Sequence, residues 1–411
     1  MITFFRQKFR SILTMFAVIG PGIIAAAVGN DAGGIATYSS VGADFGYRML
    51  WVLVPITILL IIVQEMCARM GVVSAKGLSD LIRESYGAKV TFYILIGLLL
   101  ANLSTIFSEF AGIAGSMEIF NVPRYISVPI GAFLVWIFIT RGNYRRVEKI
   151  FLAAAVVYLA YIISGFLAKP DWSAVFHSTF VPSLDFSRPY IMALIGVVGT
   201  TITPWMQFYL QASVVEKGVK VENYRYTKID IVLGSVLSSM VAFFIMMVAG
   251  ATLHPHGIHI QDASDAARAL APLAGNSAEI LFAIGLLNAS LLGAMIVPLA
   301  TSYYICEGLG FESGVSKTFR EAPWFNGIFT ALIILGAIPA LFPQTPLIKV
   351  MIMAQVINGI LLAPILIFII LLINKKWLMG EHVNKPWYNF LAGAAVLILI
   401  TLSIILTVSS F

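Results

Sequence analysis

Gly29-Asn30-Asp31-Ala32-Gly33-Gly34 interrupts the first long apolar stretch of this sequence, where a continuous membrane helix would otherwise be expected. A carboxylate inside a membrane costs roughly 2.5–3.5 kcal/mol on insertion scales, so such a residue indicates a functional site by default. The glycines weaken the helix and free backbone carbonyls, which is tolerated at membrane depth only where the backbone lines a cavity or a water-filled path. We therefore expect a site around Asp31.

The composition of the whole chain is that of an integral membrane protein. Of its 411 residues 59% are hydrophobic and 11% are charged, whereas soluble domains carry about 25% charged residues. Stretches of roughly 20 apolar residues, each long enough to cross a bilayer, leave no room for a soluble domain. They predict an all-α membrane protein with eleven transmembrane helices, at about 12–41, 48–73, 90–117, 123–141, 147–168, 188–215, 229–253, 279–306, 323–343, 346–373 and 386–410.

Most basic residues lie on one side of this predicted arrangement. The N-terminal tail and every second connection between spans together hold 20 of the 26 Lys and Arg residues. By the positive-inside rule the N-terminus is cytoplasmic and, after eleven crossings, the C-terminus is extracellular. The net charge of +6 is therefore a topology signal. We expect a multi-pass monomer of the cell membrane, surrounded by lipid, with no nucleic-acid partner.

A second break lies in the sixth span, at Thr200-Thr201-Ile202-Thr203-Pro204. Interrupted helices in corresponding positions of two inverted halves point to a transporter's binding site at the membrane midplane. A proline kink, which is common in membrane helices, is the alternative for Pro204. We expect one transporter domain over 1–411, built from inverted five-helix repeats at about 12–168 and 188–373 plus an eleventh helix at 386–410.

Several motifs resemble those of the NRAMP (natural resistance-associated macrophage protein) divalent-metal transporters. The likeness covers nearly the whole chain and is carried by Gly20-Pro21-Gly22, Asp31-Ala32-Gly33-Gly34, Phe45-Gly46-Tyr47, residues 64–83, Glu307-Gly308 and residues 374–380. The resemblance implies a leucine-transporter-like fold and a metal site where the first and sixth helices unwind. It implies that a metal ion is the transported substrate.

The departures from the family pattern bear on the choice of ion. The asparagine of the family's DPGN motif aligns with Gly34, and its sixth-span methionine aligns with Thr203. A thioether favours transition metals, whereas a hydroxyl suits hard ions such as Mg²⁺. Losing the asparagine is also expected to enlarge the cavity, and Mg²⁺ usually keeps several waters when a protein binds it. The pattern is similar to the magnesium-transporting branch related to the NRAMP family.

We therefore expect import of Mg²⁺, and also of Mn²⁺, as partly hydrated ions by alternating access. Asp31 is the expected ionic ligand and Thr203 a hydroxyl ligand, while carbonyls freed near Val28 and Thr200 supply further oxygens. The alternative for Thr203 is a hydroxyl that bonds back to its own helix.

Other polar residues near the breaks have weaker expectations. Asn30 and Gly34 flank the ion, and Gln207 holds a metal-bound water. Gln355, with Asn358, completes the site or a gate, with helix–helix hydrogen bonds as the alternative. Glu109 either joins a polar network near the intracellular path or pairs with a neighbouring span.

Proton coupling needs titratable groups in the transport path, and the sixth span has none before Glu216. A divalent cation that enters a cell with a negative-inside potential of about 100 mV gains about 4.6 kcal/mol, equivalent to roughly three decades of concentration. We expect transport without proton coupling. The alternatives are a proton-coupled Mn²⁺ or Fe²⁺ symporter, and an amino-acid transporter of the same fold in which Asp31 binds the substrate amine.

No HExxH or GxSxG motif occurs, so neither enzyme activity nor a cofactor is expected.

Two features away from the breaks are expected to lie outside the transport path. Cys67 and Cys306 lie near cytoplasmic ends of spans and are expected to be buried and unpaired. The external sequence 254–259 holds three histidines, and imidazoles suit Zn, Cu and Ni. Its spacing is set by proline and glycine, which favours a solvated loop over a metal-capture site. Residues 262–265 then start a short external helix.

Overall fold

The computed structural model describes residues 20–141, 159–270, 275 and 278–408. Within these ranges every regular element is a helix, and eight helices are long and apolar enough to cross a membrane. The prediction of an all-α, multi-pass membrane protein is confirmed. The first residues of the predicted first and fifth spans, 12–19 and 147–158, and the last two of the eleventh lie outside the described part of the chain.

Each of the eleven predicted spans has a helical counterpart among the described residues. In chain order these are α2 (Pro21–Ala27), η1 (Val28–Asn30) and α3 (Ala32–Phe45); η2 (Leu50–Val52) and α4 (Leu53–Ser74); α5 (Leu78–Ile119); α6 (Arg124–Thr140); α8 (Leu159–Leu167); α10 (Arg188–Thr201) and α11 (Pro204–Glu216); α12 (Tyr224–Thr252); α15 (Ala278–Leu309); α16 (Pro323–Ala337); α17 (Leu347–Ile373); and α19 (Pro386–Val408). The first and sixth spans are each two helices in sequence, as predicted.

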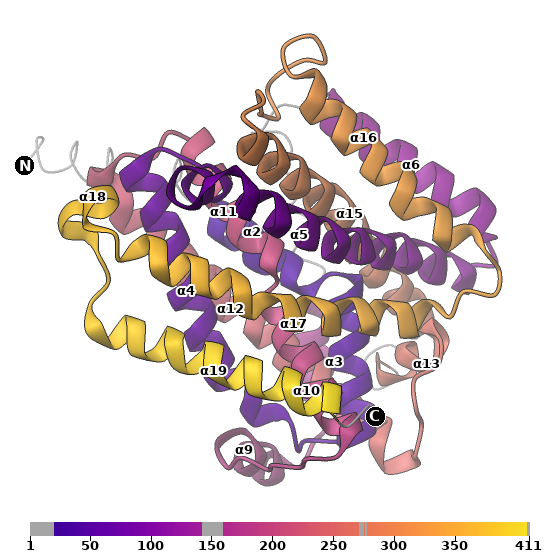
Figure 1. Cartoon of the computed structure of the whole chain (residues 1–411). Helices are drawn as coiled ribbons and strands as arrows, with labels where there is room; N and C mark the ends of the chain where they lie inside the picture. Colours follow the sequence, from indigo (N-terminus) through magenta and orange to yellow (C-terminus); the bar gives the residue numbers. More distant parts are fainter. Residues whose placement is uncertain (1–19, 142–158, 271–274, 276–277, 409–411) are drawn as a thin grey trace, which may run out of the picture.

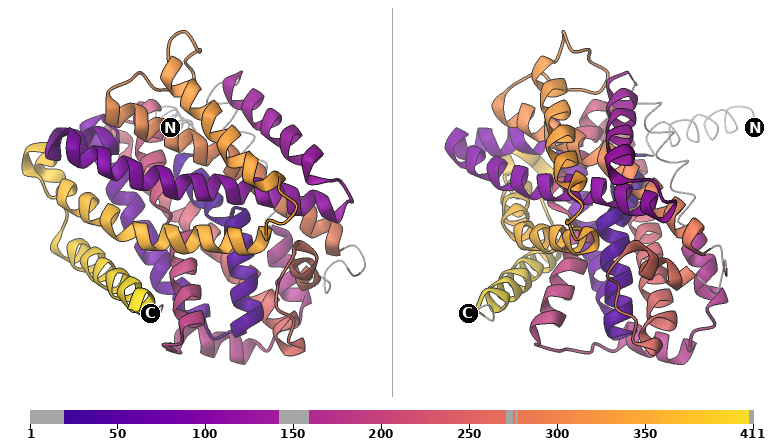
Figure 2. Two further views of the ribbon diagram at one scale, coloured as in Figure 1. Left: turned by 45° about the vertical axis from the view of Figure 1, so that its right-hand side comes forward. Right: turned by 90° about the vertical axis from the view of Figure 1, so that its right-hand side faces the viewer.

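The helices pack in two groups that α17 joins (Figures 1 and 2). In one group α12 packs against α2, α3 and α4, and α4 packs against α11. In the other, α5 packs against α15, α16 and α6. Helix α17 packs against α5 of the second group and against α3 of the first, as well as against α10, so it contacts both groups. Helices α6 and α16 lie side by side at one edge of the bundle, and α19 lies at another.

The crossing of α10 and α17 brings two backbones almost into contact. A Cβ added at Gly199 would lie 2.0 Å from the carbonyl oxygen of Gln355, and one at Gly359 would lie 2.4 Å from that of Ile195. No larger residue fits either position without moving a helix. This crossing carries Gln355 of α17 into the centre of the bundle, beside both broken spans.

The helical segments that were not predicted from the sequence include the first turns of α5, helix α9 and helix α18 (Lys376–Met379). Helix α5 begins at Leu78, and its first turns end at Gly87, whose φ of +82° suits glycine. Helix α9 (Trp172–Phe180) lies in the connection that precedes α10, where the Asp171 side chain accepts the N–H groups of Ser173 and Ala174. Such N-capping side chains are readable in a sequence. The spans were predicted from apolar runs, which do not mark short helical segments of this kind.

The short helix predicted to start at 262–265 is present as α13 (Ala263–Ala267), with Asp262 accepting the N–H of Asp265. The three histidines before it face different partners. The Nδ1 atoms of His254, His256 and His259 lie 2.7–2.9 Å from oxygens of Ala43, Thr252 and Asp44 respectively. Among the described residues no group of three or more His, Cys, Asp or Glu could hold a metal. Cys67 and Cys306 are buried and free, as predicted.

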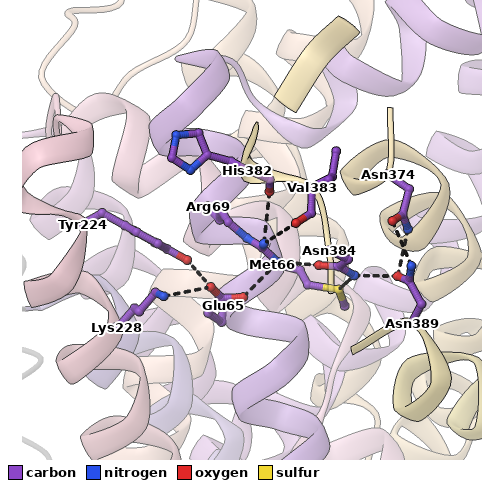
Figure 3. A network of polar contacts seen from close by, with 10 residues as sticks. All are labelled: Glu65, Met66, Arg69, Tyr224, Lys228, Asn374, His382, Val383, Asn384 and Asn389. Carbon is purple, nitrogen blue, oxygen red and sulfur yellow. Dashed lines mark hydrogen bonds and ion pairs between the residues drawn. The ribbon is translucent and has the colours of Figure 1, made fainter. Parts of the chain in front are cut away.

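A buried polar network joins α4 to α12 and to the connection between α17 and α19 (Figure 3). At its centre Glu65 and Arg69 of α4 form an ion pair with an N–O distance of 3.2 Å. Tyr224 and Lys228 of α12 contact Glu65, and Arg69 donates to backbone carbonyls of His382 and Val383. The remaining members are Met66, Asn374, Asn384 and Asn389. The network fixes this end of α4 against two neighbouring elements.

Candidate metal site

The first break places Asp31 as the N-cap residue of α3. One oxygen of its carboxylate, Oδ1, accepts the N–H of Gly34 at 2.7 Å. This bond satisfies one of the N–H groups that every helix start leaves without an intrahelical partner. The other oxygen, Oδ2, is buried and accepts no N–H or hydroxyl donor within the described residues, although the Asp31 side chain interacts with the neighbouring Glu109 carboxyl group. Asp31 therefore keeps one carboxylate oxygen available for a ligand.

The second break follows from Pro204. Proline has no backbone N–H, so the carbonyl of Thr200, four residues earlier, loses its helical donor. Helix α10 ends at Thr201, and α11 begins at Pro204 with Thr203 as its N-cap residue. The hydroxyl of Thr203 makes no capping bond and, as far as the described residues go, has no hydrogen-bond partner. The alternative that this hydroxyl bonds back to its own helix is wrong.

The two breaks meet at Gly29. The hydroxyl of Thr200 donates to the carbonyl of Gly29 at 3.3 Å. A Cβ added at Gly29 would lie 3.4 Å from both the Thr200 carbonyl oxygen and the Met206 methyl group. Residues on both sides of the second break therefore contact the first. The carbonyl of Val28 lies in the same turn and accepts the N–H of Asp31 at 3.0 Å, which leaves it one lone pair.

The space beside Gly34 differs from the prediction. A Cβ added there would lie 2.6 Å from the carbonyl oxygen of Gly29 and 3.1 Å from the hydroxyl of Thr200. The missing asparagine therefore leaves no enlarged cavity directly beside Gly34 in this conformation, because the Gly29 carbonyl of η1 occupies that space. The prediction of a wider space next to Gly34 is wrong.

Glu109 of α5 lies directly beside Asp31, which the sequence left open. Its carboxylate accepts the N–H of Ala32 at 3.4 Å, and the two acidic side chains interact with each other. A Cβ added at Gly293 of α15 would lie 2.3 Å from the Glu109 carboxyl carbon, so this glycine makes room for the side chain. Glu109 is an intramembrane carboxylate, the same signal that singled out Asp31.

Gln355 of α17 lies directly against the first break. A Cβ added at Gly33 would lie 1.9 Å from its amide nitrogen. That nitrogen is buried without a hydrogen-bond partner among the described residues, while the amide oxygen accepts from Asn358 at 3.1 Å. Asn358 also donates to Thr105 of α5 at 3.0 Å. Gln355 thus hydrogen-bonds within α17 and lies beside Gly33, whereas Asn358 makes the hydrogen bond to the neighbouring helix α5.

The side-chain amides of Asn30 and Gln207 contact residues other than Asp31. The amide nitrogen of Asn30 donates to the hydroxyl of Ser238 on α12 at 2.9 Å. The amide nitrogen of Gln207 lies 3.4 Å from the Thr203 carbonyl, and its oxygen lies 3.9 Å from the Cys67 sulfur of α4. Both amides are engaged in contacts that position the broken spans.

A methionine that the family pattern does not predict, Met206, lies beside the site. Met206 follows Pro204 by two residues, and its methyl group contacts the Gly29 position. Its sulfur accepts a hydrogen bond from the Gln64 amide of α4 at 3.0 Å. The thioether of the family's sixth-span methionine is absent at Thr203, as predicted, but a thioether is present at Met206, one turn along the same half-helix. A methionine two residues after the break proline was the signal available in the sequence.

The site is closed to solvent in this conformation. Asp31 and Thr203 are each 1% exposed, and Glu109 and Gln355 are fully buried. The two breaks offer one carboxylate oxygen, one hydroxyl and two backbone carbonyls, with the Glu109 carboxylate beside Asp31. Hard cations prefer such oxygen ligands.

Comparison with known proteins identifies the family. Residues 22–409 match the profile described as "Natural resistance-associated macrophage protein-like". The chain belongs to the NRAMP family. Among similar NRAMP relatives, the chain is 26% identical to the divalent metal cation transporter MntH of Bacillus subtilis, over 98% of this chain and 95% of that protein. It is 28% identical to the protein of the same name from Yersinia pestis, over 98% and 97%.

Solved structures place the NRAMP chain in the predicted fold. A manganese transporter of Eremococcus coleocola, in complex with an aromatic bis-isothiourea substituted compound, aligns with a TM-score of 0.78 at 21% identity, covering 94% of this chain and 85% of that one. MhsT in complex with L-phenylalanine aligns with a TM-score of 0.60 at 15% identity, covering 95% and 98%. The leucine-transporter-like fold is confirmed. The relatives are named as transporters, in agreement with the prediction that the chain is no enzyme.

Proposed function

We propose that this NRAMP protein imports divalent metal cations by alternating access, with Mg²⁺ as its main substrate and Mn²⁺ as a second. One observation carries the proposal. Asp31 Oδ2 and Thr203 Oγ1 are buried at the starts of the two second half-helices, and apart from the Glu109 carboxyl group that interacts with Asp31, neither oxygen has a hydrogen-bond partner among the described residues. Buried polar atoms are normally paired. Two unpaired hard oxygens beside the meeting point of the breaks fit a hard cation.

The carbonyls of Val28 and Thr200 are the further ligands in this proposal. Both lie at the ends of first half-helices, where the negative end of the helix dipole favours a cation. Pro204 leaves the Thr200 carbonyl without its helical donor, and the Val28 carbonyl has a lone pair to spare. Asn30, Gly34, Gln207 and Gln355 shape the surroundings of the ion in this assignment without binding it directly.

Partial hydration of the ion follows from the small number of charged ligands. Mg²⁺ dehydrates reluctantly and is bound through one or two carboxylates together with waters. No group of three or more His, Cys, Asp or Glu in the described ranges could enclose a metal. We assign Asp31 as the direct carboxylate ligand and Glu109 as a carboxylate that adds negative potential behind it.

The proposed setting is a monomer in the lipid bilayer of the cell membrane, with the N-terminus in the cytoplasm and the C-terminus outside. In this proposal residues 1–411 form one transporter domain with inverted repeats at about 12–168 and 188–373, followed by the eleventh helix at 386–410. The membrane potential alone drives import, since a divalent ion gains about 4.6 kcal/mol per 100 mV.

A second candidate is a proton-coupled Mn²⁺ or Fe²⁺ symporter, and Glu109 is the observation that favours it. A titratable group in contact with Asp31 could take a proton when the metal leaves. The sixth span has no Asp, Glu or His before Glu216, but Glu109 lies on the third span and provides a titratable group there. An amino-acid substrate is disfavoured because its carboxylate would meet the carboxylates of Asp31 and Glu109.

The deciding experiment is flux into proteoliposomes that contain both a metal indicator and a pH indicator. The proposal predicts uptake of Mg²⁺ and Mn²⁺ driven by a negative-inside potential, with no acidification of the lumen. Mn²⁺ uptake with matching acidification, and no competition by millimolar Mg²⁺, would establish the second candidate instead.

A further inference from the structure

One face of α12 follows the first half-helix α2 along its whole described length. Asp230, Gly234 and Ser238 are spaced by four residues, so they lie on the same face of α12. Each of them contacts a different part of α2. This stripe takes no part in the proposed metal site, yet it contains a fully buried carboxylate at Asp230.

Asp230 binds the start of α2. Its carboxylate accepts three backbone N–H groups, from Gly20 at 3.1 Å, Gly22 at 2.7 Å and Ile23 at 3.3 Å. The first N–H groups of a helix have no intrahelical acceptor, and their partial positive charge favours a carboxylate. Hydrogen bonds to an ionised acceptor are about twice as strong as neutral ones. A residue of a distant span therefore caps α2.

This contact explains the Gly20-Pro21-Gly22 motif. Gly20 has a φ of +144°, which favours glycine. Pro21 occupies the first helical position, where a missing N–H costs nothing. A Cβ added at Gly22 would lie 2.9 Å from the Asp230 carboxylate. All three residues suit a helix start that is held against Asp230.

The same face of α12 continues to the break. A Cβ added at Gly234 would lie 2.7 Å from the Ile23 Cα and 2.8 Å from the Gly22 carbonyl oxygen, so the two backbones touch. The Ser238 hydroxyl donates to the Ala26 carbonyl at 2.5 Å and accepts from Asn30 at 2.9 Å. The stripe therefore fixes α2 from its first residue to the turn that precedes Asp31.

We propose that Asp230 is a positioning residue for transport, which docks α2 on α12 and so sets the Val28 carbonyl and the Asp31 carboxylate at the metal site. The role in metal binding rests on the proposed function, whereas the docking itself does not. Moving α2 away from α12 breaks three charge-assisted hydrogen bonds at once and leaves buried N–H groups without acceptors. Asp230 thus holds this side of the site closed.

Two variants test the proposal by different means. Asp230→Asn removes the charge with little change of volume, and Gly234→Ala keeps the charge but places a methyl group between the backbones. Ser239→Ala is the matched control, because Ser239 is a buried residue of α12 whose hydroxyl has no hydrogen-bond partner in the described structure.

The measurement is the labelling rate of one introduced cysteine in detergent-purified protein. The background carries Cys67→Ser and Cys306→Ser, which removes both native thiols. Ala25→Cys reports on α2 and Ala289→Cys reports on α15, and both positions are fully buried. A maleimide then reacts only where a helix moves away from its neighbours. This measurement needs no transport, so its outcome is independent of the substrate assignment.

We expect Asp230→Asn and Gly234→Ala each to raise the labelling rate at position 25 at least fivefold, with no change at 289 and none in Ser239→Ala. Unchanged labelling at 25 in both variants would overturn the proposal, as would fast labelling at 25 in the parent. An equal rise at 25 and 289 would also overturn it, because general loosening would then be the cause. If Asp230→Asn does not fold, Gly234→Ala decides by the same criteria.

Discussion

The carboxyl groups of Asp31 and Glu109 face each other at the start of α3, and Glu109 also accepts the N–H of Ala32 at 3.4 Å. Two carboxylates in one buried site repel each other unless a cation or a proton lies between them. Because a cation would relieve this repulsion, cation binding is expected to depend on the charge of both carboxylates. The pair also provides the sharpest distinction between the two candidate mechanisms.

Replacing Glu109 by Gln should weaken Mg²⁺ binding without abolishing transport. Loss of one nearby charge is expected to raise the half-saturating Mg²⁺ concentration about tenfold, or about 1.4 kcal/mol. Proteoliposome uptake over a range of Mg²⁺ concentrations measures this. Glu118→Gln is the control, because Glu118 lies on the same helix but pairs with Arg124 near its far end. Loss of uptake together with loss of a proton flux that the parent shows would favour the symporter.

Asp31 has two duties that two substitutions separate. Asp31→Asn keeps a side-chain oxygen for the Gly34 N–H but removes the charge, while Asp31→Ala removes both. We expect metal uptake to fall at least a hundredfold in each variant. The Ala variant should also lose about 1 kcal/mol of stability with the helix cap. Thermal unfolding in detergent reads out the second effect, and near-normal uptake by the Asn variant would exclude Asp31 as the ionic ligand.

The ion pair at the centre of Figure 3 should matter for stability and little for ion choice. In Arg69→Met the Glu65 carboxylate stays buried with fewer partners, at a cost of about 3 kcal/mol. A drop of several degrees in the unfolding temperature in detergent is expected. Arg83→Met is the control, because the Arg83–Asp80 pair is more exposed, at 33% and 27% against 11% and 7%. Equal effects of the two substitutions would contradict this assignment.

Thr203 is expected to set the preference between hard and soft ions. Thr203→Met brings a thioether to the N-cap position of α11, and a soft ligand favours transition metals. Uptake of Mg²⁺ should fall about tenfold while uptake of Mn²⁺ changes less. Thr203→Ser keeps the hydroxyl and should retain the parent's selectivity. A Met variant with the parent's ratio of Mg²⁺ to Mn²⁺ flux would show that the hydroxyl is no ligand.

The breaks were predictable because their causes are local. The glycines of 29–34 and the missing N–H of Pro204 act within one helical turn, so the sequence alone places both half-helix starts. The contacts between the breaks depend on how spans far apart in sequence pack together. Gln355 reaches Gly33 only because Gly199 and Gly359 let α10 and α17 cross closely. Such a crossing has no signature in the span pattern.

The space beside Gly34 shows why an alignment of single positions misled the prediction. Substituting a residue by glycine suggests an empty volume, but the backbone can fill it, and here the Gly29 carbonyl does so. Met206, one turn beyond position 203, brings its methyl group to Gly29, while its sulfur accepts a hydrogen bond from Gln64. The effect of glycine at position 34 thus depends on the Gly29 carbonyl beside it, and not only on the loss of the family's asparagine.

Gly34→Asn should accordingly fail to convert the protein into a transition-metal transporter. Its Cβ would lie 2.6 Å from the Gly29 carbonyl oxygen, a separation that requires the backbone of η1 to shift. That shift would also disturb the 3.3 Å hydrogen bond from Thr200 to Gly29, which joins the two breaks. We expect uptake of Mg²⁺ and Mn²⁺ to fall together, by about tenfold or more. Gly97→Asn is the control, because a Cβ at Gly97 meets nothing within 4 Å. A gain in Mn²⁺ uptake at unchanged total flux would contradict this expectation, because it would mean that the backbone of η1 can shift without any loss of transport.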